Sequence, residues 1–218
     1  MFNLFNRKKA TINSITIPSW DWIIEQDNDG LKQWMNHEGT MAMSLHFFNI
    51  PPDLPTITDL EVLRNFHRNI THKHGGGIIE STTTKLKEFD VVRTIFKIPQ
   101  QQKGMTYLAS LTIPFKDCSF VIKIQAPEIG ITGSRDSIIL DNLMRKGAVS
   151  LGENGLEGWF YDPYDPTIKE GLRMNQSEEG QYDTMFPKHP LSRARRLQRL
   201  IEKEVVFGNE LKKLNTFK

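Results

Sequence analysis

Residues 78–126 have the sequence IIESTTTKLKEFDVVRTIFKIPQQQKGMTYLASLTIPFKDCSFVIKIQA. Apolar and polar residues alternate along much of it, most regularly over 105–113 and 118–126. A period of two is typical of a β-strand with one face on a core. The connections are short and polar, which favours antiparallel hairpins because a parallel pair needs a crossover of a dozen or more residues. The sequence therefore predicts consecutive antiparallel strands over 78–86, 89–98, 105–113 and 118–126.

Shorter strands are expected upstream of this stretch. Over 11–18, Ile12, Ile15 and Ile17 provide an apolar side. Over 41–47 every second residue is apolar, which again indicates a strand with one buried face.

Two segments have the apolar spacing of amphipathic helices. The first covers 58–72, with Thr58 as a candidate N-cap. The second covers 134–146, with Ser134 as a candidate N-cap and Gly147 as its end, since glycine accepts the left-handed backbone that follows a helix.

The composition changes after Gly147. Over 151–184, eight acidic residues stand against two basic ones, for a formal charge of −6, and the segment is rich in Gly, Pro and Tyr. Over 186–218 the balance reverses to +6. A helical apolar stripe runs through this last segment at Leu191, Ala194, Leu197, Ile201 and Val205. We therefore expect a domain at 1–148, and at 149–218 an acidic Tyr/Pro-rich arm followed by a basic amphipathic helix.

The order of elements resembles that of the PsbP-like fold group over about residues 11–148. The sequence features that carry the resemblance are Ile17, Pro18 and Trp20 at the start, and Met105, Thr106, Tyr107, Phe120 and Lys123 before the second helix. That group includes photosystem extrinsic proteins, Ran-binding Mog-type proteins, DcrB-type lipoproteins and adaptor chaperones of type VI secretion effectors. The resemblance implies an α+β sandwich, a twisted antiparallel sheet of about six strands packed with two helices, and a role in binding other proteins without catalysis.

Composition excludes several classes of protein. The chain has 218 residues, a single cysteine and a formal net charge of +2. One cysteine excludes an internal disulfide framework and a multi-cysteine zinc module. The sequence contains no run of 18 apolar residues, so it predicts no membrane-spanning helix. Residues 1–9 lack the apolar stretch of a secretory signal. We expect a cytoplasmic protein that does not associate with a membrane.

The densest group of side chains that could bind a metal ion consists of three histidines, His67, His72 and His74. No neighbouring carboxylate or cysteine completes a set, and cationic residues before a glycine stop are also usual at the end of a helix. The carboxylate pairs Asp162/Asp165 and Glu178/Glu179 lie in a charged, turn-rich stretch that we expect to be solvated. The sequence predicts no catalytic residue, metal or cofactor.

Trp and Tyr in a polar, turn-rich segment, and Arg on a helix, are typical of protein interfaces. The candidate partner-binding residues are Trp159, Phe160, Tyr161, Tyr164, Arg193 and Arg196. The alternative for the aromatic residues is that they fasten the arm to the sheet. The near-neutral net charge and the acidic segment upstream argue against nucleic acid as the partner of the arginines.

These features predict a non-catalytic bacterial protein-binding module, in the first place an immunity protein that neutralises a toxin of an interbacterial competition system. The alternative is an adaptor chaperone for a secreted type VI effector, which predicts an exposed apolar groove on the sheet. A third hypothesis is an enzyme or metal-binding protein that uses His67, His72 and His74, with these histidines and the carboxylates of the arm meeting in one cleft.

Overall fold

The structure, a computed structural model, describes residues 9–218. The expectation that residues 1–9 form no secretory signal therefore lies almost wholly outside the described residues. None of the helices in the described range combines the length and the hydropathy of a membrane-crossing helix.

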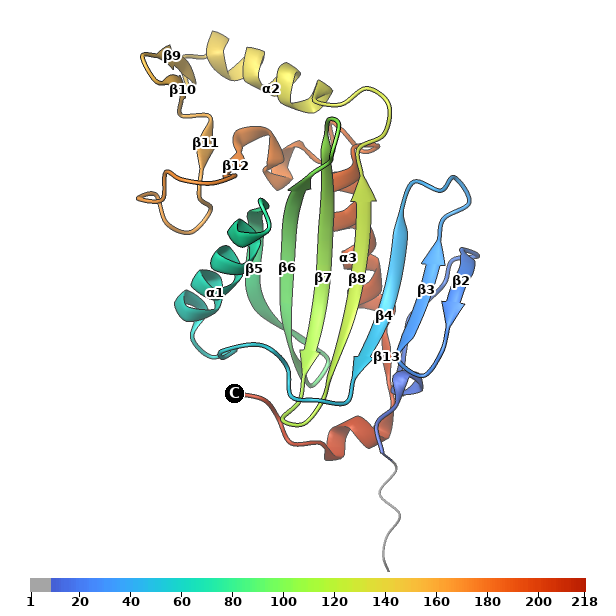
Figure 1. The fold of residues 1–218 in the computed structure, drawn as a ribbon. Coiled ribbons are helices and arrows are strands. Elements are labelled where there is room, and N and C mark those ends of the chain that lie inside the picture. Colours follow the sequence, from blue (N-terminus) through green and yellow to red (C-terminus); the bar gives the residue numbers. More distant parts are fainter. Residues whose placement is uncertain (1–8) are drawn as a thin grey trace, which may run out of the picture.

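An antiparallel sheet of seven strands forms the centre of the molecule, in the order β2-β3-β4-β8-β7-β6-β5 (Figure 1). Its strands are β2 (Ile23–Asp27), β3 (Leu31–Met35), β4 (Ala42–Phe48), β5 (Gly77–Leu86), β6 (Phe89–Pro99), β7 (Met105–Pro114) and β8 (Ser119–Pro127). The predicted α+β fold with consecutive antiparallel hairpins is confirmed. The sheet has seven strands instead of about six because β2 and β3, which have no clear period of two, also join it.

Three helices and several short elements complete the chain. The helices are α1 (Leu60–Lys73), α2 (Ser134–Arg145) and α3 (Pro190–Glu204). Short strand pairs are β1 (Ile15–Thr16) with β13 (Val206–Phe207), β9 (Ser150–Gly152) with β10 (Gly155–Glu157), and β11 (Phe160–Tyr161) with β12 (Met174–Asn175). The 3-10 helices are η1 (Ile12–Ser14), η2 (Gln176–Glu178), η3 (Gly180–Tyr182) and η4 (Asn209–Lys213). The segment expected to be a strand over 11–18 is mostly η1 and the two residues of β1.

Both predicted helix starts shift by one residue. Asp59, and not Thr58, is the N-cap of α1, since its side chain accepts hydrogen bonds from two backbone N–H groups of the first turn. Gly133, with a φ of 74°, precedes α2, and Ser134 is the first helical residue. A left-handed backbone at that position suits glycine, so the turn and not a side-chain cap begins this helix.

The core lies between one face of the sheet and α3. Alternate residues of β7, among them Ala109 and Leu111, point to this side and are buried. α3 packs on β7 and β8 from behind the sheet in Figure 1, and its residues Leu191, Ala194 and Ile201 are fully buried there. The last segment of the chain therefore closes the core of the first.

The opposite face of the sheet carries both polar and apolar side chains. α1 packs at β5, on the left of Figure 1, and no helix of the described residues lies in front of β7, β8 and β4. The register places the polar residues Thr94, Ser110, Lys123 and Ser44 side by side across this face, and the neighbouring rows include Leu108 and Val121. The alternation thus puts the buried core on the α3 side and a mixed surface on the other side.

The second predicted helix packs differently from expectation. α2 lies above the sheet in Figure 1 and packs mainly on η2, within a separate apolar cluster around Ile139, Val149 and Trp159. α3 buries Leu191, Ala194, Leu197 and Ile201, whereas α2 buries Ile139 and Arg135. α3 therefore covers the sheet, and α2 packs on the arm.

We expect Ile201→Ala to lower the free energy of unfolding by about 2–5 kcal/mol, because it opens a cavity between α3 and the sheet. The neighbouring Leu200, which is partly exposed, provides the matched control, and Leu200→Ala should cost less than about 1 kcal/mol. Urea denaturation of both variants measures the difference. Equal losses would contradict the packing of α3 as the cover of the core.

Candidate functional site

A buried ion pair fastens the arm (residues 149–189) to the sheet. The Nζ atom of Lys97 lies 2.6 Å from Oε2 of Glu178, and the two side chains are 2 % and 1 % exposed. The same carboxylate accepts hydrogen bonds from the Tyr107 hydroxyl at 3.3 Å and from the backbone N–H of Asn175 at 2.9 Å. The expectation that Glu178 is solvated is wrong, since its basic partner lies on β6, 81 residues away in the sequence.

A second buried pair holds the arm against α1. Nε of Arg68 donates to Oδ2 of Asp162 at 2.8 Å, and Nη2 donates to Oδ1 at 2.9 Å. Asp162 also accepts the backbone N–H groups of Tyr164 and Asp165, so its carboxylate is fully engaged. Despite the desolvation, the bonds from Arg68 keep the pKa of Asp162 below its usual range. Asp162 is therefore buried and structural, contrary to expectation, whereas Asp165 is only partly buried.

Most of the aromatic residues predicted to bind a partner make internal contacts. Trp159 is buried in the cluster with Ile139, and the Tyr161 hydroxyl donates to Oε1 of Glu179 at 3.0 Å. The Tyr164 hydroxyl accepts the backbone N–H of Ser81 at the edge of the sheet. Phe160 is 42 % exposed and remains available at the surface. The alternative, in which aromatic residues fasten the arm to the sheet, describes Tyr164, which is bonded to β5, and Tyr161, which packs against the main core, whereas Trp159 packs beside α2. Partner binding by this set stays a prediction.

The three histidines lie in different surroundings. His67 is buried on α1, and its Nδ1 atom lies 2.8 Å from the Ser81 hydroxyl. The ring of His72 packs at Gly171, and His74 is the exposed C-cap of α1. Within residues 9–218, no group of three His, Cys, Asp or Glu side chains could hold a metal ion.

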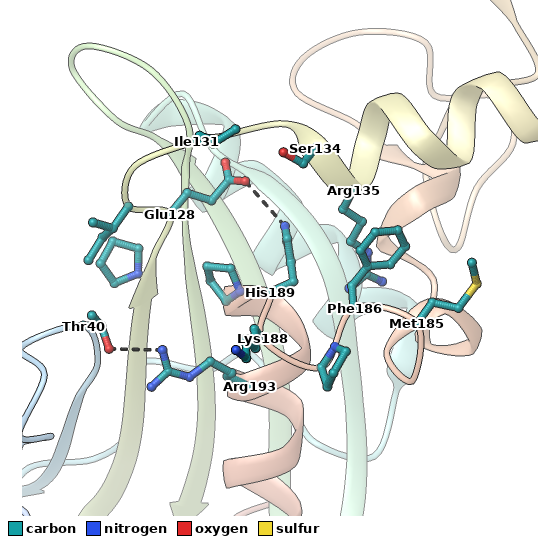
Figure 2. Close-up of a pocket in the computed structure, with 14 residues that line it drawn as sticks. Thr40, Glu128, Ile131, Ser134, Arg135, Met185, Phe186, Lys188, His189 and Arg193 are labelled. Atoms are coloured by element: carbon teal, nitrogen blue, oxygen red, sulfur yellow. Dashed lines mark hydrogen bonds and ion pairs between the residues drawn. The ribbon is translucent and has the colours of Figure 1, made fainter.

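A hollow of about 620 Å³ opens where the segment after β8 meets the segment before α3 (Figure 2). We call it the loop hollow. Its lining includes Ile129, Ile131, Met185, Phe186, Lys188 and Arg193. Both segments contain glycine or proline next to a helix start, which keeps them out of regular structure and brings their side chains to one opening.

A contact between Glu128 and His189 closes one side of the loop hollow. Oε1 of Glu128 lies 3.4 Å from Nε2 of His189, and the pair is drawn with a dashed line in Figure 2. Glu128 also accepts the backbone N–H groups of Met105 and Gly133. These bonds outweigh its desolvation and lower the pKa of Glu128. Nδ1 of His189 accepts the N–H of Leu191, so His189 is also the N-cap of α3.

A second hollow of about 290 Å³, which we call the tryptophan hollow, lies further along α3. Its lining includes Trp20, Trp22, Met41, Arg193, Arg196 and Leu200. Arg193 lines both hollows, so they adjoin at its side chain. We call the two together the Arg193 groove. The guanidinium of Arg193 donates to Oγ1 of Thr40 at 3.1 Å and to a carboxylate oxygen of Glu38 at 3.4 Å.

The turn that carries the tryptophans has an unusual backbone. Trp20 and Asp21 have φ values of 46° and 61°, and the N–H of Trp22 closes the turn on the carbonyl of Ser19 at 2.9 Å. A left-handed backbone costs about 1–2 kcal/mol for each non-glycine residue. Packing of Trp20 and Trp22 against the main core offsets this cost. The turn thus fixes two half-buried indole rings at the groove.

The structure brings together only part of the predicted partner-binding set. Arg193 and Arg196 both line the tryptophan hollow, whereas the four aromatic residues of the arm do not line either hollow. Trp20 and Trp22 are not among the predicted binding residues, although the sequence shows both an Arg-rich helix and a Trp-Asp-Trp motif. Nothing in the sequence indicated that positions 173 residues apart would meet.

No protein-family model and no curated protein matches the sequence. Among solved structures, a protein of Bacteroides thetaiotaomicron is 11 % identical, with a TM-score of 0.36, over 70 % of this chain and 49 % of the other. The Saccharomyces cerevisiae Ran-binding protein Mog1p is 13 % identical, with a TM-score of 0.39, over 59 % of this chain and 78 % of the other. A single-residue mutant of Mog1 is 10 % identical, with a TM-score of 0.44, over 91 % of this chain and 93 % of the other. The chain spans about half the length of the Bacteroides structure.

Mog-type proteins belong to the fold group that the sequence resembles, and they are among the structural matches. At these identities and TM-scores the likeness is limited to the course of the backbone. It says nothing of what this chain binds.

We expect Lys97→Met to destabilise the protein by about 3–5 kcal/mol, because it leaves the Glu178 carboxylate buried without its cation. The double variant Lys97→Met/Glu178→Gln removes both charges and keeps an oxygen acceptor for the Asn175 N–H. Chemical denaturation should show that the double variant recovers more than half of the loss. A double variant as unstable as Lys97→Met would mean that shape, and not charge, controls this contact.

The buried His67 should make the free energy of unfolding depend on pH. Burial lowers its pKa from 6.5 to about 4, so below pH 6.5 the unfolded chain binds a proton that the folded protein excludes. The free energy of unfolding should therefore fall as the pH drops from 6.5 to 4, by about 3 kcal/mol. His67→Gln should flatten this part of the curve, while the control His74→Gln, at an exposed histidine, should leave it unchanged. Identical curves for His67→Gln and the unchanged protein would refute the assignment.

Proposed function

We propose that the chain is a non-catalytic protein-binding module of the bacterial cytoplasm, and specifically an immunity protein that neutralises a toxin of an interbacterial competition system. The observation that carries the proposal is the Arg193 groove, in which Trp, Arg and exposed aliphatic side chains meet. Trp and Arg are the residue types that contribute most to the energy of protein interfaces.

The chemistry of the groove suits a rapid and specific encounter with an acidic partner. Arg196 and Lys188 are exposed, and Arg193 is partly exposed beside them. Positive side chains at the rim of an interface increase the rate of association and reject partners of like charge. A toxin must be bound before it acts, so a fast association favours neutralisation.

The adaptor-chaperone hypothesis expects an exposed apolar groove on the sheet. The apolar face of this sheet is covered by α3, and on its other face the polar row Thr94, Ser110 and Lys123 separates the half-buried Leu108 from the half-buried Val121. A face that a polar row divides offers no continuous apolar groove for the helix of an effector. This observation favours the immunity hypothesis over the adaptor.

The enzyme hypothesis expects the histidines and the carboxylates of the arm to meet in one cleft. Glu178 is instead paired with Lys97, Asp162 with Arg68, and His67 with Ser81. Each group has its own buried partner, so they do not form a shared acid–base site. This arrangement supports a binding role.

Co-expression tests the proposal. The gene beside this one would be induced in Escherichia coli with and without this chain, and survival counted. We expect the chain to restore growth by at least a hundredfold, and Trp20→Ala combined with Arg196→Glu to abolish the effect. Lys123→Glu, an equal charge reversal on the exposed polar face of the sheet, is the matched control and should protect fully. Protection that survives the groove variant, or a neighbouring gene product that is harmless alone, would refute the proposal.

A further inference from the structure

We infer that the loop hollow receives an extended segment of the partner that presents a large apolar side chain beside a carboxylate. The inference deepens the proposed function, on which it rests for the partner being a protein. It concerns Arg193 and the segments that precede α2 and α3 and line this hollow.

The hollow provides apolar surface both inside and at its rim. Phe186 lies in its wall in Figure 2. Pro127 and Pro190 also line the hollow. At the rim, Ile131 is 88 % exposed and Ile129 is 60 % exposed. Apolar side chains gathered around one opening are typical of a surface that a partner covers.

The exposed rim favours a chain segment over a small molecule. A ligand confined to the hollow would leave most of Ile131 in water, since this side chain is 88 % exposed at the rim. An extended segment that crosses the opening would bury the rim and fill the hollow with one side chain. The tryptophan hollow continues the surface on the other side of Arg193, so a segment has further contacts along its path.

The charged side chains that line the hollow favour a partner segment with negative charge. Among the described residues, Glu128 is the one acidic side chain in the lining, and it is engaged by His189 and two backbone N–H groups. The positive charges of Lys188 and Arg193 at the opening therefore outweigh it. A carboxylate that enters here meets attraction and no free negative group.

Arg193 is placed to take such a carboxylate. Its contact with Glu38 spans 3.4 Å, and the Glu38 side chain is 71 % exposed. An exposed ion pair of this kind contributes little to stability, so a partner's carboxylate can replace it at small cost. A guanidinium also binds a carboxylate with two parallel hydrogen bonds, which adds geometric specificity.

Selection from a phage library of random 12-residue peptides on the full chain tests the inference. We expect the recovered peptides to carry Asp or Glu within two positions of Phe, Trp, Leu, Ile or Met. Synthetic copies should bind at least tenfold more weakly to Arg193→Glu, to Lys188→Glu and to Ile131→Ser. The matched controls are Lys123→Glu and Ile138→Ser, which lie outside the groove, and both should bind within twofold of the unchanged chain.

Lys188 and Ile131 are exposed, so their variants report on binding even if Arg193→Glu alters the fold. An absence of acidic residues in the peptides, binding that none of the three variants weakens, or the recovery of no binder would overturn the inference. The selection needs no toxin, so its result is independent of the co-expression test. Peptides of the expected kind together with failed protection would leave the inference standing and remove the immunity role.

Discussion

The apolar face of the sheet needs a cover, and the residues that provide it come from the far end of the chain. α3 begins 63 residues after β8 ends. The arm between them has to cross the end of the sheet and place α3 in register with β7 and β8. It does so through buried charges, because Lys97 and Arg68 each bind a carboxylate of the arm. The position of α3, and with it the Arg193 groove, depends on these contacts.

A second set of contacts fixes the N-terminal end of α3. Arg135, which is 1 % exposed, donates to Oγ of Ser192 at 2.8 Å and lies 3.2 Å from a carboxylate oxygen of Asp183. Arg195 binds the same Asp183 oxygen at 3.1 Å. A buried carboxylate shared by two guanidinium groups is costly to disturb, since removal of any member leaves charge without a partner. The groove therefore lies on a rigid base, and a partner spends little free energy on ordering it.

Local pattern was enough to predict the strands from β5 to β8, because alternation and short connections act between neighbours in the sequence. It was also enough for the apolar stripe of α3, in which Leu191, Ala194 and Ile201 are buried as expected. It failed for Glu178 and Asp162, whose burial depends on cations 81 and 94 residues away. It failed likewise for the groove, because Trp20 and Arg193 become neighbours only after the sheet and α3 have packed.

The basic residues of the last segment have two roles, and α3 places the residues of each role on a different side of the helix. At 3.6 residues per turn, Arg195 lies about 200° around α3 from Arg193, whereas Arg196 lies about 60° from it. Arg195 accordingly points inward to Asp183, and Arg193 and Arg196 share the tryptophan hollow. Part of the positive charge is thus neutralised within the fold, and the remainder is displayed on one side of the helix. Net charge along the sequence cannot distinguish these two parts, of which the one on Arg193 and Arg196 is displayed at the groove.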